Sequence, residues 1–355
     1  MKDSKLARER GRLVADFLAR SWRDPPPPLD ISPDQLELIT ALLFDSGGVG
    51  LAWWRVRETN LNNTSNGALL HQAYRLQALQ SAMQEERTAS AFSLLRDAGI
   101  EPILIKGWSV ARLYPHSTLR AYGDIDLLVH AAQYPAASQV LKRAEANTWW
   151  IDLHQRLSEL EGRATEGLFE RSHTVDFKET SVRVLCPEDH LALLAIHFFK
   201  HGAWRPSWLC DIAAMVESLP ADFDWKQCLG PNKQRSTWIR SAIVLAHELL
   251  QVNIDKAPLT IRMTRVPEWL SDAVLKQWGN LLDDRHLPVR PRRLLADSLG
   301  SPKRLLKEIS ARWPDPITAT FNLNRQVNNF PRFPYQLGAY FSQATRYLVD
   351  QLLTF

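Results

Sequence analysis

The chain has 355 residues, 45% of them hydrophobic and 23% charged, which allows two or three compact domains and excludes wholesale disorder. Its 43 Lys and Arg exceed its 39 Asp and Glu by only four, so the sequence is not that of a polybasic protein built around a polyanion. Three cysteines without C-x-x-C spacing argue against a disulfide framework and a structural zinc site, and the charged amino terminus shows neither a signal peptide nor a membrane span. We therefore expect a soluble cytoplasmic protein.

The first predicted elements are helices. Apolar residues at helical spacing predict a helix before the proline run at 25–28, and Ser32 with Pro33 begins a second helix that reaches Phe44. The glycine-rich stretch 47–50 follows this helix and no strand, so we interpret it as a loop and not as a phosphate cradle. A long helix with an apolar stripe is predicted over 68–98, with Gly99 as its terminating residue.

The middle of the chain has the pattern of an α/β unit. Residues 100–105 predict a buried strand, 124–129 a half-polar strand and 149–153 a third strand, with helical pieces over 109–114 and 131–146 between them. A hairpin over 175–185 precedes an apolar helix over 191–199, and the remainder is mostly helical. The fold class is thus α+β, with an N-terminal helical segment (1–65), an α/β core (66–190) and a helical C-terminal domain (191–355).

Two aspartates on the second strand are the main candidates for chemistry. Asp124 and Asp126 stand two apart, so on a strand their side chains share a face and their repulsion favours a cation. Oxygen ligands suit Mg²⁺ or Mn²⁺, which can clamp a triphosphate for nucleotidyl transfer. The first strand ends in Lys106-Gly107, where a lysine charge and a glycine backbone can approach a phosphate.

These residues resemble the nucleotidyltransferases of the DNA polymerase β superfamily, in particular a poorly characterised bacterial branch. The resemblance covers roughly residues 70–215. It lies in Lys106-Gly107, Tyr114-Pro115, Arg120, the strand Gly123 to Val129, Ile151-Asp152-Leu153-His154, the run Pro187 to Leu191, His197, His201, and Trp208 with Asp211.

The resemblance implies a polymerase β-like core that moves a nucleoside monophosphate from an NTP such as ATP to an acceptor. Asp124, Asp126 and Asp152 would be catalytic and would bind Mg²⁺ or Mn²⁺. The nucleotide-binding residues would be Lys106, Gly107, Ser109 and Arg120. The wider superfamily has Gly-Ser where this chain has Lys106-Gly107, and Ser109 lies two residues on. The acceptor, whether small molecule, peptide, protein or RNA, cannot be read from the sequence, and no membrane partner is expected.

Several alternatives stay open at this point. Asp176 is a second candidate for the third carboxylate, although Asp152 follows the Asp126 strand after a single helix and can return beside it. His197 and His201 share a helical face but lack the glutamate of H-E-x-x-H, so we interpret them as core or domain-contact residues. A secondary role in lining the acceptor side stays open. Residues 285–312 hold eight Lys and Arg against two acidic residues. This basic run is either a solvated helical face or an RNA contact. Other candidate functions are a catalytically inactive binding protein and an RNA-modifying toxin of the same fold.

Overall fold

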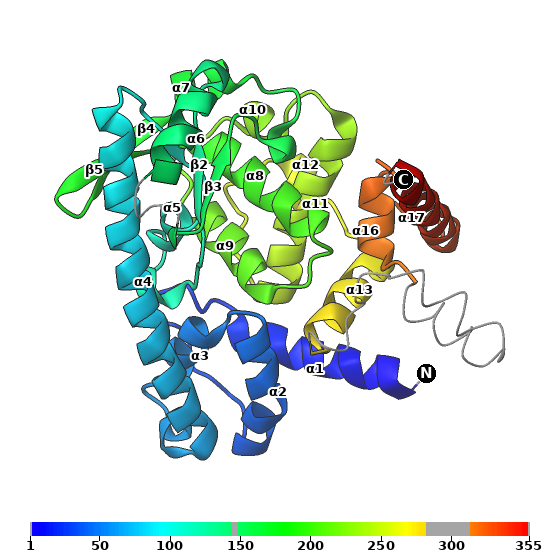
Figure 1. Ribbon diagram of the computed structural model, residues 1–355. Coiled ribbons are helices and arrows are strands. Elements are labelled where there is room, and N and C mark those ends of the chain that lie inside the picture. The colour runs from blue at the N-terminus through cyan, green and yellow to red at the C-terminus, as the bar shows by residue number, and fades with distance from the viewer. Residues whose placement is uncertain (1, 144–147, 282–312, 354–355) are drawn as a thin grey trace.

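A five-stranded mixed sheet organises the middle of the chain in the computed structural model, which describes residues 2–143, 148–281 and 313–353 (Figure 1). Its strand order is β3-β2-β1-β5-β4. β1 pairs with β2 antiparallel and with β5 parallel, β2 pairs with β3 parallel, and β4 and β5 form an antiparallel hairpin. The strands are β1 (Ile103–Leu104), β2 (Ile125–Leu128), β3 (Ile151–His154), β4 (His173–Phe177) and β5 (Thr180–Val184).

Helices precede, flank and follow this sheet. Before it and along its side lie α1 (Lys2–Leu18), α2 (Pro33–Asp45), α3 (Val49–Val56), η1 (Asn60–Asn63) and α4 (Ser65–Asp97). Between the strands lie α5 (Trp108–Ala111), η2 (Ser117–Leu119), η3 (Ala131–Gln133), α6 (Tyr134–Arg143), η5 (Ser158–Leu160) and α7 (Thr165–Arg171). After the sheet lie α8 (Pro187–Lys200), α9 (Pro206–Glu217), α10 (Trp225–Leu229), α11 (Lys233–Leu250), α12 (Leu259–Arg262), α13 (Glu268–Trp278), α16 (Pro316–Asn322) and α17 (Phe333–Leu353).

Local sequence signals explain where the early helices begin and end. The Ser32 hydroxyl accepts from the Gln35 backbone and the Gln35 side chain accepts from Ser32 N, which is a complete capping box at the start of α2. Gly99 follows α4 with a φ of +73°, a conformation that glycine adopts without strain. The expected loop at 47–50 is shorter than predicted because α3 already begins at Val49.

Two hydrophobic clusters cover the two faces of the sheet. The smaller cluster packs Ile125, Leu127 and Val184 from the strands against Phe92 and Leu95 of α4, and α6 joins it. The larger cluster covers the opposite face and joins sheet residues such as Leu128 to α8, α9 and α11. Because strand side chains alternate, each strand residue is assigned to one face or the other.

The long helix α4 runs along one side of the molecule (Figure 1). Four of the residues in its expected apolar stripe are at least half exposed, namely Leu69, Leu76, Leu79 and Met83. The inward face instead carries buried Gln77 and Gln84, whose amides donate to the backbone carbonyls of Thr118 and Gly123. α4 therefore holds the loop that leads into β2 through polar contacts.

The amino-terminal and carboxy-terminal parts of the described chain pack together. α1 lies along α13 and also contacts α11, and the larger hydrophobic cluster runs from Val14 to Ile317. The domain boundaries at residues 65 and 190 stay a prediction. The basic run 285–312 lies outside the described residues.

Two further expectations concern the cysteines and the membrane. Cys186, Cys210 and Cys228 are all buried free thiols, in keeping with the absence of a disulfide framework. Within the described ranges, every helix is too short or too polar to cross a bilayer.

Candidate active site

The site arises from two neighbouring parallel strands whose polar residues face the same way. Ile125 and Leu127 of β2 pack into the smaller cluster, which leaves Asp126 on the opposite face. Ile151 and Leu153 of β3 pack against the same cluster, so Asp152 and His154 alternate onto the face of Asp126. The strand register pairs Asp126 directly with Asp152. Sequence alternation and register together place two carboxylates side by side.

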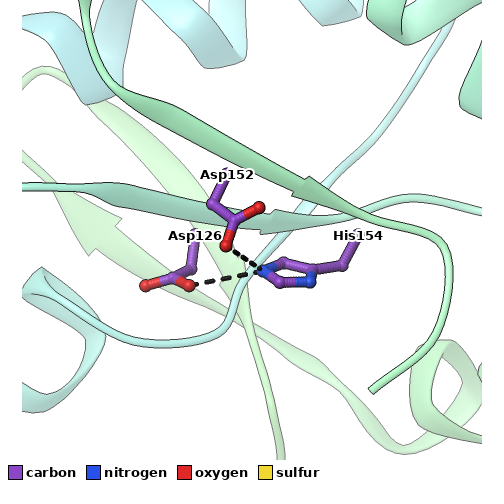
Figure 2. A group of neighbouring side chains, drawn as sticks. All are labelled: Asp126, Asp152 and His154. Carbon is purple, nitrogen blue, oxygen red and sulfur yellow. Dashed lines mark hydrogen bonds and ion pairs between the residues drawn. The ribbon is translucent and has the colours of Figure 1, made fainter. Parts of the chain in front are cut away.

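Asp126, Asp152 and His154 form a tight group of potential metal ligands (Figure 2). One ligand atom from each residue lies within 4.8 Å of the others. His154 Nε2 lies 3.3 Å from Asp126 Oδ1 and 3.3 Å from Asp152 Oδ2. The Asp126 side chain is 3% exposed and that of Asp152 is 62% exposed, so the group joins a buried carboxylate to one open to solvent. Carboxylate oxygens suit Mg²⁺ or Mn²⁺, and the imidazole nitrogen adds a donor that Mn²⁺ accepts more readily.

Lys106 reaches the buried carboxylate of this group. Its Nζ lies 2.9 Å from Asp126 Oδ1, and the Lys106 side chain is 17% exposed. Burial alone would raise the pKa of Asp126, but the hydrogen bond with His154 and the positive charge of Lys106 outweigh burial and lower that pKa. Asp126 is therefore an ionised carboxylate held by a lysine in this structure.

Gly107 gives the turn after β1 its shape. Its φ of +64° lies in the left-handed region, and a Cβ built there would lie 3.3 Å from the Tyr122 ring and 3.6 Å from the Asp124 carbonyl oxygen. The backbone of the Lys106-Gly107 turn thus passes close to the segment that carries Asp124. A side chain at position 107 would be strained and crowded.

Ser109 and Arg120, both expected to contact the nucleotide, are engaged within the protein. The Ser109 hydroxyl is fully buried and donates to the Lys106 carbonyl at 3.1 Å, which fixes the turn that carries Lys106. Arg120 donates from Nε and Nη2 to Asp211, with Nη2 at 2.9 Å from Oδ2, and Tyr114 donates to the same carboxylate at 2.7 Å. Burial lowers the pKa of Arg120, but the contacts with Asp211 outweigh burial and raise it. Both side chains therefore bind other residues of the protein: Ser109 holds the Lys106 turn, and Arg120 holds Asp211.

Asp124 lies just before β2 and is exposed, outside the group of three potential ligands. Its charge acts on two arginines nearby. Burial and the neighbouring Arg120 lower the pKa of Arg205, whereas Asp124 opposes that shift. Asp124 is thus an exposed carboxylate next to the strand that carries Asp126, close enough to Arg120 and Arg205 to act on their charges.

Asp176, the competing candidate for the third carboxylate, lies on β4 at the far edge of the sheet. Two strands, β1 and β5, separate β4 from β2. Asp152 is the acidic residue that the sheet brings beside Asp126.

His197 and His201 pack with aromatic residues beside the site. Their rings are 4.5 Å apart, and Trp208 lies 4.9 Å from the His197 ring. Burial is the main cause that lowers the pKa of His197, and the positive charge of Lys106 lowers it further. Within the part of the chain that the structure describes, neither histidine belongs to a group of three metal-ligating side chains. These ring contacts agree with the prediction that both histidines are core or domain-contact residues.

Sequence reasoning named His154 and Asp211 among the residues that carry the resemblance, but it assigned neither a role in the site. His154 is the second residue after Asp152, and strand alternation puts it on the same face, so the D-x-H spacing was the available signal. Asp211 lies far along the chain from Arg120, and only the packing of α9 against α5 reveals the pairing.

Comparison with known proteins agrees with this geometry. A family model described as an uncharacterised nucleotidyltransferase matches residues 32–251, more than half of the chain. Searches of curated proteins and of solved structures found no match to the chain.

Proposed function

Because the chain belongs to this uncharacterised nucleotidyltransferase family, we propose that it transfers a nucleoside monophosphate from an NTP to an acceptor with the help of a divalent metal. The observation that carries the proposal is the ligand group of Asp126, Asp152 and His154, whose donor atoms lie within 4.8 Å. Two carboxylates in register on neighbouring strands are a suitable anchor for Mg²⁺ or Mn²⁺.

Asp126 and Asp152 would hold the metal, and Asp124, on the exposed segment before β2, would add another carboxylate. The metal, when bound, would neutralise charge that develops on the phosphate oxygens. The acceptor oxygen would form a bond to the α-phosphorus while the bond to the bridging oxygen breaks, so that pyrophosphate leaves. Asp152 is the exposed carboxylate of the pair, and it would orient the acceptor hydroxyl or take its proton.

Lys106 and Gly107 would receive the triphosphate. The Lys106 ammonium lies at the ligand group, and the glycine backbone carries no Cβ that would keep a phosphate away. Ser109 would act through the Lys106 carbonyl, and Arg120 through Asp211, so both would position other residues.

The direct experiment uses each of the four NTPs labelled at the α-phosphate, with Mg²⁺ and a cell extract as the source of acceptor. We expect label in an acceptor product and a loss of at least about 100-fold in the Asp126→Asn variant, which keeps the shape but removes the charge. Asp176→Asn is the matched control, since it makes the same change on β4, and it should retain activity. An Asp126→Asn protein as active as the parent at saturating Mg²⁺ would contradict the proposal.

A further inference from the structure

A cavity of about 820 Å³ lies among the C-terminal helices, apart from the metal ligands. It is bounded by the end of α8, the segment before α9, and parts of α13, α16 and the start of α17. This volume falls in the range of about 300–1,000 Å³ typical of sites for small organic ligands.

Aromatic side chains line the cavity from several helices. Trp204, Trp269 and Phe333 all face it. Phe333 is 60% exposed and stacks on Trp313 at 5.6 Å, so one face of its ring remains open to a ligand. Flat aromatic walls favour a ligand that carries a planar ring, because such a ring can stack on them.

The cavity lining holds two acidic side chains, Asp272 and Asp315, and two basic ones, Lys276 and Arg332. Asp315 accepts a hydrogen bond from the Thr318 backbone N–H at the start of α16. Asp272 is bound by Arg8 at 2.9 Å, so the negative charge of Asp272 is already paired. Lys276 has no ion-pair partner among residues 2–143, 148–281 and 313–353. Arg332 is only 7% exposed, yet its guanidinium donates to the backbone carbonyls of Phe330 and Asn328, which carry no full charge.

Burial lowers the pKa of Arg332, and no carboxylate among the described residues forms an ion pair with it. The same guanidinium lies 4.6 Å from the centre of the Trp269 ring. A buried cation on an aromatic face, with a lysine nearby, is suited to an anion attached to a planar ring.

From this combination we infer that the cavity binds a nucleotide unit, with its base against the aromatic walls and its phosphate toward Lys276 and Arg332. This second nucleotide site would recognise the acceptor, so the inference rests on the proposed function. The acceptor would then be a free nucleotide or an RNA strand, and not a peptide or a neutral small molecule.

His201 connects the cavity with the ring cluster that it forms with His197 and Trp208. It lines the cavity, and its ring lies 4.5 Å from that of His197. Burial is the main cause that lowers the pKa of His201 to about 4, and the positive charges of His197 and Lys200 contribute.

The test measures binding of 2-aminopurine riboside 5′-monophosphate to the full chain in EDTA, where metal-dependent binding at Asp126 is suppressed. Stacking on tryptophan quenches the fluorescence of this probe. We expect saturable quenching, at least about fivefold weaker binding of the riboside without its phosphate, and at least about tenfold weaker binding to Lys276→Glu. Lys233→Glu, the same change at an exposed lysine of α11, should bind like the parent. Asp126→Asn should also bind like the parent, since its change lies outside the cavity.

A five-nucleotide RNA with 2-aminopurine at its end tests whether the ligand is a free nucleotide or an RNA strand. Tighter binding of the RNA identifies a strand, and equal or weaker binding identifies a free nucleotide. No quenching, equal binding of the riboside, or a Lys276→Glu protein that is folded by circular dichroism and binds like the parent would overturn the inference. Nucleotide binding in the cavity together with no transfer from any NTP would remove the proposed function alone.

Discussion

Replacement of Lys106 by methionine tests how the ligand group is held together. Lys106 Nζ lies 2.9 Å from Asp126 Oδ1, and both side chains are largely buried, at 17% and 3% exposed. Lys106→Met keeps most of the apolar stem and removes the ammonium, which leaves Asp126 as a buried charge. Removing one partner of a buried ion pair costs about 3–5 kcal/mol. Because His154 still lies 3.3 Å from the same oxygen, we expect the lower end of that range.

A divalent cation should reverse much of this loss. An ion present at about 100 times its Kd stabilises the folded protein by about 2.7 kcal/mol, which nearly equals the expected cost. The assay is urea unfolding of the parent and of Lys106→Met, once in EDTA and once with saturating Mn²⁺. The gain in unfolding free energy on adding Mn²⁺ should be larger for the variant, because the lysine no longer competes for Asp126.

A double-mutant cycle with Asp126→Asn identifies the pair as the cause. In the Asp126→Asn background no buried carboxylate loses its partner, so Lys106→Met should lower the unfolding free energy by less than about 1 kcal/mol. The reasoning is wrong if Lys106→Met unfolds within about 1 kcal/mol of the parent in EDTA, or if its cost is the same in both backgrounds.

The buried ion pair of Arg120 and Asp211 should also be sensitive to substitution. Asp211→Asn leaves Arg120 unpaired and should lower the unfolding free energy by about 3 kcal/mol or more. A urea midpoint unchanged from the parent would refute this. On α4, Leu79 is 64% exposed and Leu70 is fully buried, so Leu79→Ala should cost less than about 0.5 kcal/mol and Leu70→Ala about 2–5 kcal/mol; similar thermal midpoints for the two variants would be the contrary result. Burial and neighbouring cations lower the pKa of His190 to about 3. Between about pH 6.5 and pH 3, this histidine is therefore protonated in the unfolded chain but not in the folded one. The free energy of unfolding should fall on acidification through this range, by up to about 1.4 kcal/mol per pH unit. His190→Gln should reduce that slope in urea unfolding between pH 7 and pH 5, and an unchanged slope would exclude this histidine as its source.

The order of elements could be predicted because its signals are local. Alternating strands, the capping box at Ser32 and the glycine after α4 all depend on a few neighbouring residues, and the structure has these elements within a few positions of the prediction. The family resemblance drawn from Lys106-Gly107 and the Asp126 strand is confirmed by the family model.

Which face of α4 points into the protein could not be predicted in the same way. Periodicity shows that a helix has an apolar side but cannot show that Gln77 and Gln84 face inward to bind the carbonyls of Thr118 and Gly123. Those partners are about 40 residues away along the chain and become visible only after folding. The pairing of Arg120 with Asp211 has the same cause, since the two residues are brought together by helix packing.

The most direct test of the metal-dependent site is Mn²⁺ binding followed by electron paramagnetic resonance on the purified full chain. The parent should bind Mn²⁺, and both Asp126→Asn and Asp152→Asn should weaken binding by at least about tenfold, because each removes a charged ligand from the group. Asp176→Asn, the matched change two strands away from β2, should bind like the parent. Loss of Mn²⁺ binding in Asp176→Asn, with binding retained in Asp152→Asn, would contradict the assignment of this site.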